Sequence, residues 1–209
     1  MTFQGKKWCV LPAIIFAAGS VAFAQGQSSS SDPKPKTEIG QRKENQQDRI
    51  AQGVQSGQLT AGETAKLETK EAAINKETSA DRAANGGKLT PGEKAQVHRQ
   101  QNRLSRQIYR DKRNANTAHY GNNEVGQRRE NQQDRIAQGI KSGQLTAGET
   151  AKLEKQQTAI NHQVAADRAA NGGKLTPAEK AQVNKEQNRA SKNIYNKKHN
   201  ARTQPGTKK

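Results

Sequence analysis

Five arginines whose spacing suits the binding of negative charge are the residues of this chain best placed to do chemistry. They follow one another at intervals of four, three, four and three residues: Arg99, Arg103, Arg106, Arg110 and Arg113. At about 100° per residue, this spacing puts all five on one side of a helix, roughly opposite Val97, Leu104 and Ile108. A row of guanidinium groups attracts phosphates and other anions. We therefore expect a polyanion-binding surface, which we name the first basic face.

A second copy of this segment carries a shorter basic row. Three cations recur 86 residues later and form the second basic face: Lys185, Arg189 and Lys192. Asn196 and His199 stand where the first copy has Arg110 and Arg113. Another interpretation fits equally well, in which both rows are solvated helix faces that keep the protein in solution.

Groups for catalysis or for holding a metal ion are scarce. The one cysteine, Cys9, lies in the N-terminal apolar run, and the four histidines neither recur between the copies nor pair at i, i+4. We therefore predict a protein that is not an enzyme and has no cofactor and no metal site. A stretch beginning at Asp81 resembles the start of an EF-hand loop, but Ala83 and Gly92 stand where oxygen ligands are needed. A degenerate EF-hand-like calcium-binding protein is kept as an alternative.

The N-terminal residues predict an exported protein. Lys6 and Lys7 precede a short apolar run, and Ala22-Phe23-Ala24 has the small-x-small pattern of a cleavage site. We expect a signal peptide that is too short to span a membrane, a mature protein without a membrane segment, and a periplasmic or extracellular location. Its removal takes away two lysines and no acids, so the net charge of +17 falls to +15.

A duplicated segment must position the two basic faces. Residues 40–117 align without a gap on residues 126–203, and 56 of the 78 aligned positions are identical. This repeat is the unit of architecture. We expect the following order of segments: a signal peptide (1–24), a disordered leader (25–38), repeat unit 1 (39–117), a linker (118–125), repeat unit 2 (126–203) and a loose tail (204–209). The linker is expected to be either a hinge or a helical bridge, and whether the units pack together is left open.

Helix starts within each unit are marked by the pattern Leu-Thr-x-x-Glu. It begins at Leu59, Leu89, Leu145 and Leu175, and each time Thr and Glu have the spacing of a capping box. Glycines before these starts are typical of helix ends. We therefore predict an all-α tandem repeat of two three-helix units with short turns. The expected helices are 41–56, 61–84, 91–113, 127–142, 147–170 and 177–199.

Three segments of the first unit resemble a family of small exported bacterial basic helical-repeat proteins. They are QRKENQQDRI at 41–50, SGQLT at 56–60 and QNRLSRQIY at 101–109. The resemblance covers about residues 40–203 and implies export and a helical build rather than an activity. The four Leu-Thr-x-x-Glu starts are also similar to the Leu-Thr-x-x-Gln motif of Spy/CpxP-type periplasmic chaperones, with glutamate in place of glutamine. That similarity implies unfolded proteins as clients.

These observations together predict an exported, non-catalytic binding or structural protein. Its basic faces would engage an anionic surface or polymer, such as an envelope polyanion, nucleic acid or an acidic protein. A Spy/CpxP-like chaperone and the calcium-binding protein are the alternatives. The oligomeric state does not follow from the sequence.

Overall fold

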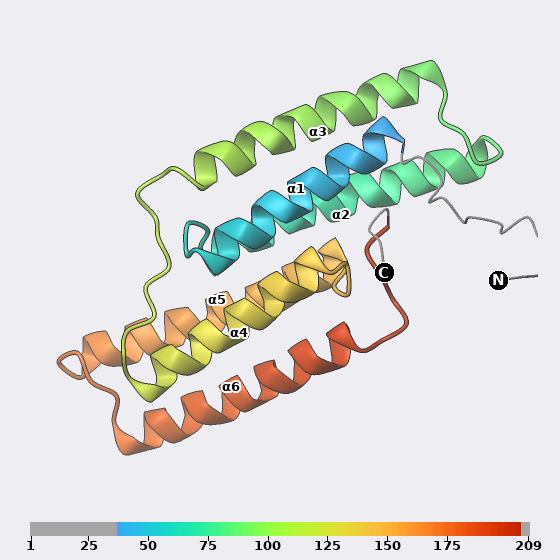
Figure 1. Cartoon of the computed structure of the whole chain (residues 1–209). Helices are drawn as coiled ribbons and strands as arrows, with labels where there is room; N and C mark the ends of the chain where they lie inside the picture. The colour runs from blue at the N-terminus through green and yellow to red at the C-terminus, as the bar shows by residue number, and fades with distance from the viewer. Residues whose placement is uncertain (1–36, 206–209) are drawn as a thin grey trace, which may run out of the picture. The chain divides into compact units, whose positions relative to one another are not determined.

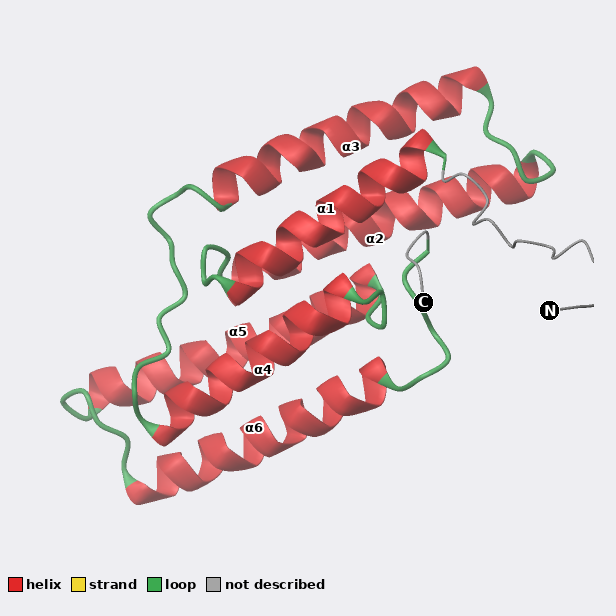
Figure 2. Ribbon diagram, viewed as in Figure 1, coloured by secondary structure: helices red, strands yellow, loops and turns green. Residues whose placement is uncertain are grey.

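Capping residues set the starts of six helices in the structure, a computed structural model that describes residues 37–205 (Figures 1 and 2). The helices are α1 Glu38–Gln55, α2 Ala61–Ala84, α3 Pro91–Asp111, α4 Glu124–Lys141, α5 Ala147–Ala170 and α6 Pro177–Lys198. Within this range there is no strand, so the predicted all-α class and the order of two three-helix units are confirmed. The predicted signal peptide and most of the predicted leader lie outside the described residues.

All four predicted capping boxes are present. At the start of α2, Thr60 Oγ1 accepts from the Glu63 amide at 3.3 Å, and Glu63 Oε2 accepts from the Thr60 amide at 3.0 Å. The same reciprocal pair occurs at Thr90, Thr146 and Thr176. Two amides that a helix start leaves without a partner are satisfied each time, which explains why these four boundaries follow from short-range sequence.

Replacing Thr60 with alanine should lower the free energy of unfolding by about 1 kcal/mol, because the Glu63 amide loses its acceptor. Ser79 is exposed in the interior of the same helix, so Ser79→Ala is the matched control and should not lose stability. Urea unfolding of both variants measures the difference. Equal losses would mean that the Thr60 cap contributes nothing specific.

The starts of α1 and α4 lie three residues earlier than predicted. Thr37 Oγ1 accepts from the Gly40 amide at 3.2 Å, and Asn123 Oδ1 accepts from the Gly126 amide at 3.1 Å. Neither cap is followed by a glutamate three residues on, so neither has the pattern of a capping box. The end of the predicted leader and the end of the predicted linker therefore belong to helices. At the other end of the first unit, α3 stops at Asp111, and Arg113 lies in the turn beyond it.

The most extensive packing between helices joins the two repeat units. α2 packs mainly on α5, and α1 packs mainly on α4, whereas the consecutive helices α1 and α2 touch only slightly. α3 lies on α1 and α2, and α6 lies on α4 and α5 (Figure 1). Residues 37–205 thus form four central helices with α3 on one side and α6 on the other.

Equivalent helices of the two units run in opposite directions, as Figure 1 shows for α1 with α4 and for α2 with α5. Their contacts come in swapped pairs. A Cβ atom placed on Gly62 would lie 3.8 Å from Thr158 Oγ1, and one placed on the equivalent Gly148 would lie 3.9 Å from the Cβ atom of Ala72, which is equivalent to Thr158. Such reciprocal contacts are typical of a two-fold relation, as in an isologous dimer.

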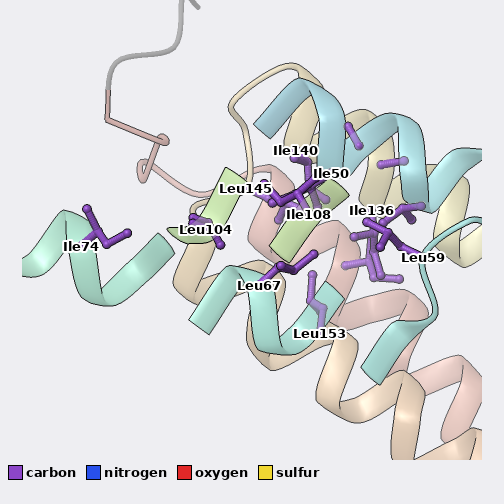
Figure 3. Close-up of a cluster of buried hydrophobic side chains, with 14 of the residues drawn as sticks. Ile50, Leu59, Leu67, Ile74, Leu104, Ile108, Ile136, Ile140, Leu145 and Leu153 are labelled. Carbon is purple, nitrogen blue, oxygen red and sulfur yellow. The ribbon is translucent and has the colours of Figure 1, made fainter. Parts of the chain in front are cut away.

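The two repeat units pack together through a shared hydrophobic core. One cluster contains Ile50, Leu67 and Ile108 of unit 1 together with Ile136, Ile140 and Leu153 of unit 2 (Figure 3). A smaller cluster around Val164 and Val183 lies within unit 2. Each unit has few large aliphatic side chains, so burying them against the other unit gives the fold a core that neither unit builds alone.

The linker crosses the surface without forming a helix between Asp111 and Glu124, which excludes a helical bridge. Its Ala118 amide donates to the Gly57 carbonyl at 2.8 Å, and Gly57 can expose that carbonyl because it adopts a φ of 69°. The Gln204 amide makes the equivalent bond to the Gly143 carbonyl at 2.9 Å. Gln204 is buried, so the predicted tail starts at least one residue later than its predicted boundary at 204.

Candidate anion-binding surface

The first basic face lies on the outer side of α3. Val97, Leu104 and Ile108 are buried against α1 and α2, and they hold the helix in one rotation about its axis. The four arginines within the helix and Arg113 beyond it are all exposed. The structure therefore brings all five predicted residues to one surface.

Four of these arginines have no partner among the described residues. The side chains of Arg99, Arg103, Arg106 and Arg110 make no hydrogen bond or ion pair there. The nearby acids are engaged by amides instead, since Gln100 donates to Glu77 Oε2 at 2.6 Å and Gln107 donates to Asp111 Oδ2 at 3.2 Å. Arg113 differs, because its guanidinium carbon lies 4.1 Å from the centre of the Tyr109 ring.

A groove of about 460 Å³ runs between α2 and α3 along one edge of the first basic face. Arg103, Arg106 and Arg110 contribute to its wall, and Ile74 and Leu104 give it apolar lining. A negatively charged group on a larger molecule could be held by these guanidinium groups while an apolar part of that molecule contacts the groove. Arginine suits this role because its guanidinium forms two parallel hydrogen bonds with a sulfate, phosphate or carboxylate.

The second basic face is shorter, as the sequence predicts from its substitutions. Lys185, Arg189 and Lys192 are exposed on α6, and their side chains have no hydrogen bond or ion pair within residues 37–205. His199 stands at the position of Arg113, and its ring stacks on Tyr195 with centroids 4.1 Å apart. This end of α6 therefore carries an aromatic pair in place of an arginine.

The two basic faces point away from each other. α3 and α6 make no contact, and each turns its buried side toward the four central helices (Figure 1). A single short segment of polymer cannot lie across both faces at once. The arrangement instead presents two separate cationic surfaces.

A set of buried carboxyl groups between the units was not predicted from the sequence. Glu68 and Glu154 are both 0 % exposed and occupy equivalent positions on α2 and α5, and Glu71 lies one turn after Glu68. Burial raises the pKa of Glu154 to about 8 and that of Glu71 to about 7. Burial, with Glu71 and Glu154 nearby, raises the pKa of Glu68 well above its usual range. The sequence does indicate that Glu71 is buried, because its helical spacing from Leu67 and Ile74 places all three residues on the same side of α2.

Glu93, the carboxylate that follows the EF-hand-like stretch, acts as a helix cap. Asn85 Nδ2 donates to both carboxylate oxygens of Glu93, at 2.9 and 3.0 Å, and Glu93 also accepts from the Thr90 amide. Within residues 37–205 no cluster of three or more His, Cys, Asp or Glu side chains has a metal-binding arrangement. None of the helices in that range is long and apolar enough to cross a membrane.

Comparisons with protein-family models, curated proteins and solved structures gave no match. Location and family therefore remain expectations from the sequence. The arrangement of charge on α3 and α6 is the feature of the described residues that bears most directly on function.

Proposed function

We propose that this protein is an exported, non-catalytic binding protein whose two basic faces engage anionic polymers. The observation that carries the proposal is the set of four exposed arginines on α3 that have no partner among residues 37–205. An arginine row that only kept the protein in solution could equally be paired with nearby acids. Unpaired guanidinium groups leave their donors free for phosphate, sulfate or carboxylate groups, and binding releases counterions from the polymer.

The opposite orientation of the faces favours bridging of two polymer strands or two anionic surfaces. Each face alone offers a weak, salt-sensitive contact. Two faces on one protein can each hold a separate strand, so one molecule can join two strands, and several such molecules between the same two strands strengthen the assembly.

Replacing Arg99, Arg103, Arg106 and Arg110 together with glutamine should lower heparin affinity at low salt by about 100-fold. It should also reduce the slope of log affinity against log salt concentration by about 3, because each lost cation removes roughly 0.7 of a released counterion. Titration of fluorescent heparin at several salt concentrations measures both. The exposed lysines Lys66, Lys76, Lys141 and Lys152 provide a matched control, since changing them to glutamine removes the same charge from other surfaces.

Equal losses in the two variants would show that total charge, and not the first basic face, governs binding. Absence of binding by the unmodified protein at low salt would overturn the proposed function itself. Bridging has its own readout: the unmodified protein should make heparin solutions turbid at intermediate ratios. A variant lacking one basic face should bind without producing turbidity.

The two alternatives stay predictions. Clients of a chaperone usually bind to exposed apolar surface, and within residues 37–205 the exposed large hydrophobic side chains are Tyr109 and Tyr195. For the calcium alternative, the Glu93 carboxylate would have to bind the ion, but it already accepts hydrogen bonds from Asn85 and the Thr90 amide as a helix cap. Neither observation favours its alternative over polyanion binding.

A further inference from the structure

A cavity of about 270 Å³ lies beneath the linker, against the start of α2 and the sides of α4 and α5. We name it the linker cavity. Six of its lining residues matter here: Ala61, Ala118, Tyr120, Arg129, Gln133 and Gln157. It is separate from both basic faces, since none of their residues lines it.

The repeat shows what the linker cavity lacks. Ala118 and Gln204 are equivalent, because each amide donates to the carbonyl of a glycine in the first turn of a unit. The Gln204 side chain continues inward, and its Oε1 accepts from the Ala147 amide at the start of α5 at 2.8 Å. The Ala118 side chain ends at Cβ. Among the described residues, the equivalent Ala61 amide at the start of α2 therefore has no acceptor, although Ala61 is only 7 % exposed.

The carbonyl oxygen of a buried side-chain amide in the cavity lining also lacks a partner. Gln133 is 4 % exposed, and its Nε2 donates to Glu154 Oε2 at 2.9 Å. Its Oε1 has no hydrogen-bond partner in the part of the chain that the structure describes. A buried acceptor without a partner is unfavourable, so a ligand that donates to it would be stabilised.

Charge in the cavity is unbalanced. Lys43 of unit 1 has the carboxyl group of Glu71 nearby, but the equivalents of these two residues are Arg129 and Gln157. Arg129 therefore shares the cavity lining with a neutral amide, whereas its counterpart has an acid nearby. Its Nε has no hydrogen-bond partner among the described residues. Its guanidinium carbon lies 5.4 Å from the centre of the Tyr120 ring. Burial raises the pKa of Tyr120 to about 12, so the phenol stays neutral near neutral pH and does not supply the missing negative charge.

We propose that the linker cavity binds a small carboxylate, whose oxygens accept from the Ala61 amide and the Arg129 guanidinium. The carboxylate takes the place that the Gln204 amide occupies in the other unit. The positive end of the α2 dipole adds to its stabilisation. A donor on the ligand, such as an amide or ammonium group, meets Gln133 Oε1. A free amino acid and the C-terminus of a peptide both supply this chemistry.

Titration of ¹⁵N-labelled protein with N-acetylglycine, which mimics a peptide C-terminus, tests the proposal. The Ala61 amide and the Arg129 Nε–H signals should shift and saturate. Glycine in a parallel titration distinguishes a free amino acid from a peptide end. N-acetylglycinamide, which lacks the negative charge, should bind at least about tenfold more weakly, or ~1.4 kcal/mol.

Ala118→Gln supplies the missing amide from the protein itself. It should move the Ala61 signal without ligand and weaken N-acetylglycine binding by about tenfold or more. Gln204→Ala is the matched control at the equivalent position and should leave the response of Ala61 unchanged. Arg129→Lys keeps the charge that unit 1 has at this position but loses the planar fork, so it should weaken binding without unfolding the protein.

Two results would overturn the proposal. One is the absence of saturable shifts at Ala61 and Arg129 with both carboxylates. The other is binding by Ala118→Gln and Arg129→Lys with the affinity of the unmodified protein. The variant without the four α3 arginines should respond to N-acetylglycine as the unmodified protein does, so this site and the basic faces are tested separately.

Discussion

Gly126→Ala should strongly destabilise the protein, whereas the same change at the equivalent Gly40 should not. Both glycines are the third residue of a helix, after the caps Asn123 and Thr37. A Cβ atom on Gly126 would overlap the carbonyl oxygens of Tyr120 and Gly121 and lie 2.7 Å from the Tyr120 carbonyl carbon. Among residues 37–205, a Cβ atom on Gly40 would meet Thr37 Oγ1 alone, at 3.3 Å.

The expected difference between the two variants is about 1–3 kcal/mol, which is the cost of overpacking against backbone, because the gain of alanine over glycine in helix propensity is the same for both. Chemical unfolding of both variants measures it. Gly126→Ala should also shift the amide signals of the linker, since only movement of that segment relieves the overlap. Similar stabilities for the two variants would show that the linker does not lie against α4 as described.

The helices could be predicted from sequence because their boundaries are set by short-range chemistry. Thr60 and Glu63 recognise each other three residues apart, and the same holds at the three other capping boxes. The caps Thr37 and Asn123 were missed because each is followed by glycine at the third helix position, where no side chain reaches back. The exposure of the arginines on α3 could also be predicted, because it depends only on which side of that one helix carries the apolar residues.

Packing between the units could not be derived in the same way. Contacts of α1 with α4 and of α2 with α5 join residues far apart in sequence, and nothing in the aliphatic pattern says which helix covers which. The linker cavity depends on a further comparison. Identity between the copies ends near residue 117, yet the structural equivalence continues to Ala118 and Gln204, where the side chains differ. Both residues lie just beyond the aligned ranges 40–117 and 126–203.

A duplication with a two-fold relation explains why the copies diverge where they do. The threonine and glutamate residues of the capping boxes are the same in both units, whereas Lys43 and Glu71 of unit 1 stand where unit 2 has Arg129 and Gln157. In a symmetric pair of identical units, both copies of each site would be the same. Fusion into one chain frees each copy to change alone, and Arg129 and Gln157 both line the linker cavity.

Glu154→Gln should stabilise the protein at mildly alkaline pH and have little effect in acid. Glu154 is fully buried on α5, opposite Glu68 of α2, and its Oε2 accepts from Gln133 of α4. Lys43 and Gln47 of α1 and Glu71 of α2 complete this polar region. Burial raises the pKa of Glu154 to about 8, whereas an unfolded chain releases the proton near pH 4.3.

Stability changes with pH because the folded and unfolded states bind different numbers of protons at Glu154. Between about pH 4.3 and 8 the folded protein holds a proton on Glu154 that the unfolded chain has lost, so stability falls as pH rises through this range. Glu71, whose pKa burial raises to about 7, acts in the same direction. Unit 2 has a glutamine at the position equivalent to Glu71: Gln157 donates to Gln132 Oε1 at 3.0 Å. In unit 1 the equivalent acceptor, Gln46 Oε1, has no partner among the described residues. A protonated Glu71 could make the equivalent bond.

Urea unfolding at about pH 5, 7 and 8.5 should therefore show the unmodified protein losing stability as pH rises, with a weaker loss in Glu154→Gln. The variant should gain about 3 kcal/mol at the highest pH, since each unit of raised pKa corresponds to about 1.4 kcal/mol and relaxation of the site reduces the full value. Glu130→Gln, an exposed change on α4, should follow the unmodified protein at every pH. Parallel curves for Glu154→Gln and the unmodified protein would mean that Glu154 does not hold its proton in the fold. Glu68 and Glu154 would then both be charged, close together and out of water. That state is far less favourable than one in which the two buried carboxyl groups are protonated and neutral.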